Sequence, residues 1–384
     1  MKKLVIFLYI DALNSSFITY KNTPFLLNLT KKYFYQKLEN VPGYSFAIQS
    51  CLLSGKYPEE TNLWMPYYYD PKRSPLLFKM LKKAGDSLPL KKILPINYLL
   101  LHATRKFFLK KGVYANNIPF GIIDRIAIYP YYYMSEIPFF GKLKRLMIEK
   151  NETILTYLGP PKIRSNFYHS LLEHLNTSKY EKQVVMVYDD ALDGLGHRFG
   201  PNSDQYISYV RSLDRVLMVL YKKLRIISGD QFTFIVFTDH GQCERKHTLD
   251  IISELDKKAL EFGHDYISFV DATIALFWVK NEHIKEKLLD ILRDTQMGII
   301  LNEQLKKKYH ILFNDRRYGE IIFVLKPGNI FYPNFFSPFS AMKGLHGYLP
   351  ETDVQKALIL SNKGFSPHVT HIKDIKDLLL DVSS

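Results

Sequence analysis

The sequence predicts an α/β fold in which a mostly parallel central sheet is covered by helices on both faces. Three short apolar runs have the length and the β-branched or aromatic residues that are typical of fully buried parallel strands. A long pattern typical of an amphipathic helix lies between the second and the third run. Because helices that alternate with buried strands cover both faces of a parallel sheet, these observations indicate an α/β core.

The predicted strands are short and mostly apolar. They are LVIFLYI at 4–10, QVVMVY at 183–188 and FTFIVFT at 232–238, and ALILS at 357–361 is a fourth. The predicted helix covers 204–224, because its apolar residues recur at every third or fourth position. These residues are Tyr206, Val210, Leu213, Leu217 and Leu220.

The 384-residue chain is long enough for one α/β core with two insertions. We expect residues 1–61, 183–254 and 341–384 to form the core. A basic, aromatic-rich insertion covers 62–182, and a smaller α+β insertion covers 255–340. The second insertion contains DATIALFWV and EIIFVLKPG, which are typical of strands, and EHIKEKLLDILRDT, which is typical of an amphipathic helix. We expect both insertions to form cap subdomains.

The N-terminal stretch MKKLVIFLYIDALNSSF is open to two interpretations, a signal peptide or a core strand. Its lysines and apolar residues suit a signal peptide, but Asp11 interrupts the run and no small-residue cleavage site precedes it. The two cysteines, Cys51 and Cys243, are too few for a disulfide framework. No apolar run reaches the roughly 18 residues of a membrane span. We therefore expect a cytoplasmic protein.

The positive charge is concentrated in residues 62–150. The chain has a net charge of +14, and this block holds 16 Lys and Arg against 5 Asp and Glu, together with 16 of the 55 aromatic residues. Such a block can bind anionic substrates, nucleic acid or a membrane surface, or its lysines can simply be solvated. The segment LPLKKILPINYLLLHATRKFFLKK mixes leucines with lysines in a way that suits peripheral contact with a membrane.

Acids and histidines follow the predicted core strands. Asp11 follows the first strand, Asp193 and His197 follow the second, and Asp239 and His240 follow the third. In open α/β sheets the functional crevice lies beyond the carboxyl ends of the strands, so these side chains are expected to share one crevice. The glycines between Asp193 and His197 allow a non-helical path that points both side chains at one ion. The alternatives are a coincidental surface spacing and a helix-capping acid beside an incidental histidine.

Two further residues are candidates. His346 lies between glycines in GLHGYLPETD, far along the chain, where it could also be an ordinary loop histidine. Ser45 precedes an expected helix at 46–53, where a serine commonly caps the helix. A helix N-terminus also binds anionic phosphoryl groups, so a serine at this place is well positioned to attack a phosphate.

In this order, these residues resemble the alkaline phosphatase superfamily, in its type I phosphodiesterase/nucleotide pyrophosphatase family. The resemblance implies the alkaline phosphatase-like fold and two bound divalent metal ions, zinc or alternatively manganese. It implies that Asp11, Asp239, His240 and the nucleophile Ser45 bind one ion. Asp193, His197 and His346 would bind the other. The implied reaction is attack by Ser45 on phosphorus, which gives a phosphoseryl intermediate that water hydrolyses.

Two positions differ from the pattern of this family. Its members usually carry threonine where this chain has Ser45, whereas phosphatases of the superfamily use serine. An asparagine that contacts the phosphoryl oxygen is replaced by Pro66, and Asn62 is the nearest substitute for substrate binding. The C/S-x-P-x-R pattern of sulfatases is absent from SFAIQ, which argues against sulfate ester hydrolysis.

The resemblance therefore predicts a hydrolase that is a metal-dependent phosphodiesterase or pyrophosphatase. A phosphomonoesterase of the same superfamily is the alternative, and an inactive scaffold that only binds ligands is a third hypothesis. The block at 62–150 favours a small-molecule or lipid-linked phosphodiester, and its aromatic residues also suit a nucleotide. Nucleic acid is not expected, because no recognised nucleic-acid motif accompanies the charge.

Overall fold

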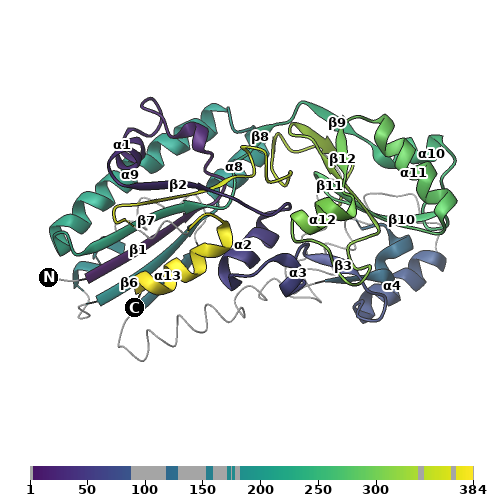
Figure 1. Cartoon of the computed structure of the whole chain (residues 1–384), viewed down its shortest axis with the longest axis horizontal. Coiled ribbons are helices and arrows are strands. Elements are labelled where there is room, and N and C mark those ends of the chain that lie inside the picture. Colours follow the sequence, from purple (N-terminus) through teal and green to yellow (C-terminus); the bar gives the residue numbers. More distant parts are fainter. Residues whose placement is uncertain are drawn as a thin grey trace.

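The computed structural model has a central sheet on one side and a smaller antiparallel sheet on the other (Figure 1). It describes residues 3–87, 118–128, 153–158, 171–173, 175–177, 182–335, 341–364 and 369–383. The interfacial segment expected at 88–111 lies outside these residues. Among the described residues, no helix combines the length and the apolar character needed to cross a membrane.

The central sheet has six strands in the order β2-β16-β7-β1-β6-β5. Strands β5, β6, β1 and β7 are parallel, and β16 runs antiparallel to both of its neighbours. This confirms the mostly parallel sheet. The bounds are β1 Lys3–Ile10, β2 Phe34–Leu38, β5 Thr153–Leu158, β6 Lys182–Asp189, β7 Phe232–Thr238 and β16 Ala357–Ser361.

The N-terminal apolar run forms β1, in the interior of this sheet, with β6 on one side and β7 on the other. Strand β5 was not expected. It lies within the range 62–182 that we assigned to an insertion, yet it pairs with β6, so the central sheet takes one strand from this range. Its apolar residues come only in pairs, at 154–155 and 157–158, and the strand therefore has no strong sequence pattern.

Alternate residues of β1 face the two sides of the sheet, because side chains alternate along a strand. Val5, Phe7 and Tyr9 pack in one buried cluster with residues of α2 and α13. Leu4, Ile6 and Leu8 pack in another cluster with residues of α1 and α9. Helices therefore cover both faces (Figure 1). Their bounds are α1 Pro24–Lys32, α2 Ser45–Ser54, α9 Asp204–Ser228 and α13 Ile375–Ser383.

A buried acid on α9 caps the start of α1. The carboxylate of Asp214, 2% exposed, accepts hydrogen bonds from the backbone N–H groups of Phe25 (3.0 Å) and Leu26 (2.9 Å). The residue before α1, Thr23, makes no side-chain capping bond. Asp214 therefore replaces the usual local cap and ties the two helices together across one face of the sheet.

We expect Asp214→Ala to lower the free energy of unfolding by about 1–3 kcal/mol, because it removes the partners of two backbone donors at a helix start. Urea unfolding followed by circular dichroism measures this change. Lys223→Ala, at an exposed position of the same helix, is the matched control and should have little effect. An equal effect of the two substitutions would contradict the capping role.

The second lobe, residues 251–335, is built on an antiparallel sheet with the order β10-β11-β13-β12. Its strands and helix α11 lie within the range 255–340 that we assigned to a smaller α+β insertion. The bounds are α10 Ile251–Lys257, β10 Tyr266–Val270, β11 Ile274–Val279, α11 Glu282–Asp294, β12 Gly298–Ile300, α12 Glu303–Lys308 and β13 Ile321–Leu325.

Part of the basic block packs on the second lobe. Strands β3 (Tyr67–Tyr69) and β4 (Ile126–Ile128) pair with each other. The ring of Tyr69 lies 5.2 Å from that of Trp278, centroid to centroid, and Tyr67 lies 5.5 Å from Phe269. The remaining elements are η1 Ser15–Phe17, α3 Pro58–Thr61, α4 Leu76–Ser87, η4 Phe120–Arg125, α8 Ala191–Phe199, β8 Cys243–Glu244, β9 His247–Leu249, β14 Asn329–Phe331, β15 Gly344–Leu345 and η7 Ile372–Asp374.

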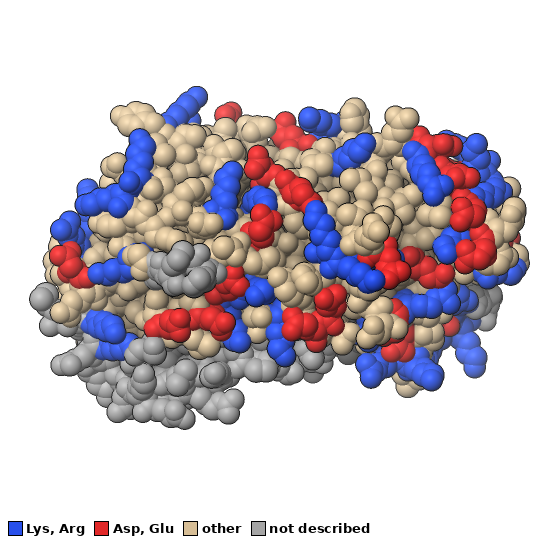
Figure 2. Space-filling view, in the orientation of Figure 1, with Lys and Arg blue, Asp and Glu red and all other residues tan. Residues whose placement is uncertain are grey.

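The charge of the basic block lies mostly outside the described residues. Only 6 of its 16 Lys and Arg are in the ranges 62–87 and 118–128. On the face shown in Figure 2, Lys and Arg are interspersed with Asp and Glu. The described part of this face therefore shows no extended patch of only positive or only negative charge.

Candidate metal centre

Seven residues converge beyond the carboxyl ends of β1, β6 and β7. The register aligns these ends, because Ile10 of β1 pairs with Asp189 of β6 and Tyr9 pairs with Phe237 of β7. We call the seven residues the metal centre. They are Asp11 after β1, Ser45 at the start of α2, Asp193 and His197 on α8, Asp239 and His240 after β7, and His346 after β15.

The first group surrounds the Nε2 atom of His240. This atom lies 3.3 Å from Asp239 Oδ2, 3.5 Å from Asp11 Oδ1 and 2.9 Å from Ser45 Oγ. Asp11, Asp239 and His240 are buried. The predicted ligand set of one ion is thus brought together.

The second group surrounds Asp193 Oδ1. His197 Nε2 lies 3.2 Å from this oxygen and His346 Nε2 lies 3.5 Å from it, while the two Nε2 atoms are 3.2 Å apart. The two groups adjoin, because the rings of His240 and His346 stack with their centroids 3.8 Å apart. Ligand atoms of His240, Asp193 and His346 also lie within 4.8 Å of one another, so His240 is within reach of both groups.

These distances fit a metal ion in each group. Tetrahedral zinc with ligands at about 2.0–2.1 Å has ligand atoms roughly 3.3 Å apart, and most of the separations above lie close to that value. Asp11 Oδ1 and Asp239 Oδ2 are also buried with no hydrogen-bond partner among the described residues. A pair of buried carboxylate oxygens without donors is costly unless a cation lies between them.

The electrostatics of the two groups agree with cation binding. Burial, and then the charge of Asp239, raise the pKa of Asp11 well above its ordinary value. Burial, and then the nearby His240, lower the pKa of His346 well below its ordinary value, which favours the neutral imidazole that binds metals. Ion binding would offset the repulsion between the carboxylates.

Backbone carbonyls lie beside the Nδ1 atoms of two of these histidines. His197 Nδ1 lies 2.9 Å from Gly344 O, and His240 Nδ1 lies 2.9 Å from Gly241 O. With the ring proton on Nδ1, each Nδ1–H group would donate to its carbonyl, and the lone pair of Nε2 would face the metal centre. Sequence reasoning cannot find these contacts, because the acceptors are main-chain atoms.

Asp193 and His197 lie on a helix, so the non-helical path that we expected between them is wrong. Residues four apart on α8 lie on the same face, and this brings the two side chains together. Glycine is needed at position 196 because of close packing rather than for a non-helical path. A Cβ built on Gly196 would lie 1.7 Å from Gln242 Oε1. The missing side chain leaves room for Gln242, whose Nε2 donates to Asp193 Oδ1 (2.7 Å).

Gly196→Ala is expected to lower metal affinity and activity by about 10–100-fold, because it displaces the amide that orients Asp193. Equilibrium dialysis with zinc measures the affinity. Gly194→Ala is the matched control on the same helix, since a Cβ there meets no atom within 4 Å among the described residues. Equal zinc affinities in the two variants would contradict the positioning of Asp193 by Gln242.

Ser45 is the first residue of α2 rather than its cap. The carbonyl of Tyr44 accepts from the N–H groups of Ala47 (2.9 Å) and Ile48 (3.2 Å), so Tyr44 is the capping residue. Ser45 Oγ is thereby free to face His240 from the positive end of a ten-residue helix. The alternative that Ser45 caps this helix is wrong.

Two residues that sequence reasoning missed support Asp11. The hydroxyl of Tyr188 donates to Asp11 Oδ2, and Gln49 Nε2 donates to the Tyr188 hydroxyl oxygen (3.1 Å). Tyr188 is the seventh residue of β6 and Gln49 lies one helical turn after Ser45. Such partners orient a metal-binding carboxylate.

Asn62 lies at the C-terminal end of α3 in a left-handed conformation (φ 59°), and it is exposed. Its carbonyl accepts from the Tyr318 hydroxyl (3.0 Å). Its assignment as a substrate contact stays a prediction.

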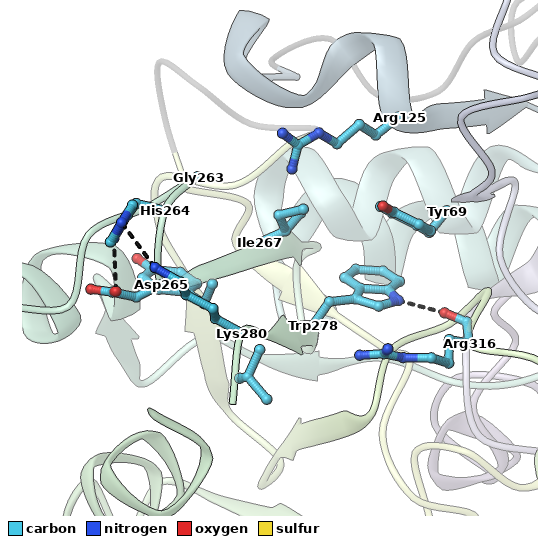
Figure 3. Close-up of a pocket in the computed structure, with 11 residues that line it drawn as sticks. Tyr69, Arg125, Gly263, His264, Asp265, Ile267, Trp278, Lys280 and Arg316 are labelled. Atoms are coloured by element: carbon cyan, nitrogen blue, oxygen red, sulfur yellow. Dashed lines mark hydrogen bonds and ion pairs between the residues drawn. The ribbon is translucent and has the colours of Figure 1, made fainter. Parts of the chain in front are cut away.

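A cavity of about 270 Å³ is lined by residues of the second lobe together with Tyr69 and Arg125 (Figure 3). Tyr69 and Trp278 form an aromatic wall, and Arg125 and Arg316 lie at its edges. Arg316 pairs with Glu320. None of the seven residues of the metal centre lines this cavity.

Asp271 is a buried acid at the turn between β10 and β11, 1% exposed. Its carboxylate accepts from the backbone of Ala272 (2.6 Å) and from the hydroxyl of Tyr67 (2.8 Å). Burial is the main cause that raises the pKa of Asp271 to about 7. The ordinary value in an unfolded chain is about 3.9.

Between pH of about 4 and about 7, the folded state therefore binds more protons at Asp271 than the unfolded state. The free energy of unfolding is expected to fall as pH rises through this window, by at most about 1.4 kcal/mol per pH unit from this group, and to level off above it. Urea unfolding at several pH values should show a flatter profile for Asp271→Asn. Asp290→Asn, at an exposed acid, is the control. Parallel profiles for Asp271→Asn and the parent would contradict this assignment.

Comparison with known proteins gives one family and one fold. A family model described as type I phosphodiesterase/nucleotide pyrophosphatase matches residues 5–349. The fold is similar to that of two structures of murine ectonucleotide pyrophosphatase/phosphodiesterase 5. One is an inactive variant in complex with AMP (TM-score 0.64, 16% identity), and the other is described by the name of the protein alone (TM-score 0.63, 17% identity). The fold is also similar to that of human ectonucleotide pyrophosphatase/phosphodiesterase 5 (TM-score 0.60, 16% identity). Each alignment covers 100% of this chain and 95% of the other.

Proposed function

Because the chain belongs to the type I phosphodiesterase/nucleotide pyrophosphatase family, whose members are hydrolases of phosphoric ester bonds, we propose that it hydrolyses a phosphodiester or phosphoanhydride through Ser45. The observation that carries this proposal is the position of the Ser45 hydroxyl. It lies at the N-terminus of α2, 2.9 Å from His240 Nε2, beside both ligand groups. A nucleophile, a positive helix end and two candidate metal sites thus meet at one place.

The residues present fit two divalent ions. Asp11, Asp239, His240 and Ser45 would hold one, and Asp193, His197 and His346 would hold the other. Mixed carboxylate and imidazole ligands suit zinc, with manganese as the alternative. When bound, such ions supply positive charge that stabilises the attacking and the leaving oxygen of an in-line displacement.

The groups of the chain itself perform the remaining steps. Ser45 Oγ releases its proton to solvent and forms a bond to phosphorus while the bond from phosphorus to the leaving oxygen breaks, and this gives a phosphoseryl intermediate. The leaving oxygen takes up a proton from solvent. The positive end of α2 attracts the phosphoryl oxygens. Water then displaces Oγ from phosphorus, and Ser45 regains its proton. Tyr188 and Gln242 hold Asp11 and Asp193 in orientation through both steps.

For the substrate, a nucleotide has the more direct support. The murine relative of similar fold is described in complex with AMP. A lipid-linked phosphodiester and peripheral membrane contact rest on the segment 88–111, which lies outside the described residues. We therefore propose a nucleotide-type small phosphodiester first, in a protein that acts in the cytoplasm.

The proposal is tested by comparing bis(p-nitrophenyl) phosphate with p-nitrophenyl phosphate. We expect kcat/KM for the diester to be at least about tenfold higher, a preference of about 1.4 kcal/mol or more in transition-state binding. A preference for the monoester would overturn the diesterase proposal in favour of a phosphomonoesterase. Turnover of neither ester by zinc-loaded protein would support the inactive scaffold.

A further inference from the structure

The turn Asp271–Ala272–Thr273 of the second lobe reaches the metal centre from two sides. The backbone N–H of Thr273 donates to the hydroxyl oxygen of Tyr44 (2.8 Å), the residue before Ser45. Thr273 Oγ1 lies 2.9 Å from the carbonyl oxygen of Gly347 and 3.2 Å from that of His346. One residue of the second lobe therefore contacts both the segment of Ser45 and the segment of His346.

Thr273 holds the Tyr44 hydroxyl through two of its atoms. Besides the N–H bond, Thr273 Oγ1 lies 3.1 Å from the Tyr44 hydroxyl oxygen, while the hydroxyl of Tyr67 donates to the Asp271 carboxylate of the same turn (2.8 Å). A phenol has one proton to donate and lone pairs to accept with, and here the N–H and the Oγ1 of Thr273 are its two partners. Both hydrogen-bonding functions of the Tyr44 hydroxyl are thus satisfied within the protein.

The ring of Tyr44 is also wedged against the loop that carries His346. It meets the His346 ring edge-on, with centroids 5.7 Å apart. Gly347 has φ +89°, and a Cβ built on it would lie 2.5 Å from Tyr44 Cε1. Because the carbonyl of Tyr44 also caps α2, a shift of this residue would move the start of the helix, and Ser45 with it.

We propose that Tyr44 is a positioning residue, whose hydroxyl is held by Thr273 so that Ser45 is fixed relative to His346. This inference rests on the proposed function of Ser45. The second lobe thereby contributes to turnover without supplying a group that touches the substrate.

The test measures kcat, KM and bound zinc for Tyr44→Phe, Thr273→Val and the double variant. We expect each single substitution to lower kcat by about 10–100-fold, since a small misplacement of a reacting group has an effect of this size, with little change in KM or zinc content. The double variant should fall no further than the lower single variant, because both substitutions release the same contact. Thr273→Ser, which keeps the hydroxyl, should retain parental kcat.

Tyr67→Phe is the matched control. It removes a hydroxyl bonded to the Asp271 carboxylate of the same turn, but Tyr67 is 1% exposed and packs against Phe269 and Phe335. We expect thermal stability to fall about as much as in Tyr44→Phe, with parental kcat. A merely structural role of Tyr44 would instead make the two variants alike in kcat.

Three results would overturn the inference. The first is a kcat of Tyr44→Phe within about twofold of the parent, and the second is a loss of kcat in Tyr67→Phe as large as that in Tyr44→Phe. The third is a double variant in which the effects of Tyr44→Phe and Thr273→Val on kcat simply multiply. Failure of the proposed function looks different. In that case the parent has no esterase activity, or Ser45→Ala keeps the parental activity, whatever the Tyr44 variants do.

Discussion

Replacement of Ser45 by alanine is expected to reduce diester turnover by a factor on the order of 10⁴ or more, which is the size of effect seen when a nucleophile is removed from a catalytic unit. The reason is chemical, because alanine has no atom that can bond to phosphorus. The other six residues of the metal centre are unchanged, so the content of bound metal should stay close to that of the parent. Steady-state kinetics and elemental analysis of the purified variant measure both quantities.

The control for this variant is Ser54→Ala, at the other end of the same helix. Ser54 Oγ donates to the carbonyl of Ser50 (2.6 Å) and has no contact with the metal centre among the described residues. We expect it to keep parental turnover. Mass spectrometry of acid-quenched parent enzyme should also show a covalent adduct on the peptide with Ser45. Turnover by Ser45→Ala within about tenfold of the parent would rule out the phosphoseryl route.

Removal of divalent ions by a chelator is expected to abolish turnover and to lower thermal stability at neutral pH. Asp11 and Asp239 are buried side by side with oxygens that lack donors among the described residues, so their charges repel each other when no cation is bound. Added zinc should restore both properties, with two ions per chain by elemental analysis. Differential scanning calorimetry follows the change in stability.

Single-ligand variants refine this experiment. His346→Ala should bind one ion fewer than the parent. The control is His264→Ala, which should bind as many ions as the parent. It removes an exposed histidine of the second lobe that pairs with Asp265. Full activity and unchanged melting temperature after chelation, with the absence of metal confirmed by elemental analysis, would refute the metal dependence of the enzyme.

The sequence predicts the ligand cluster well because strong local patterns place its members. Residues 4–10 and 232–238 are strongly apolar runs, so the pattern alone puts Asp11 and Asp239 at the ends of buried strands. Parallel pairing then brings these ends together. The path of α8 could not be predicted in this way. Its two glycines argue against a helix locally, and the reason for Gly196 is a contact with Gln242, 46 positions along the chain.

The residues that sequence reasoning missed act through contacts between distant segments. Tyr188 follows an apolar run and looks like one more buried aromatic residue, and only the fold shows that its hydroxyl reaches Asp11. Thr273 lies in a predicted strand, and its contact with Tyr44 joins positions separated by 229 residues. No periodicity marks such pairs, because their partners are decided by tertiary packing.

The contact of Thr273 with Tyr44 and Gly347 also has a consequence for how this protein diverges from its relatives. An insertion that only borders an active site can be exchanged between homologues as a module. Here the turn 271–273 of the second lobe is hydrogen-bonded to core residues on both sides of the metal centre. A chimaera that takes this lobe from a relative would have to inherit compatible residues at 44 and 347 as well. Positions 44, 273 and 347 are therefore expected to evolve as a set.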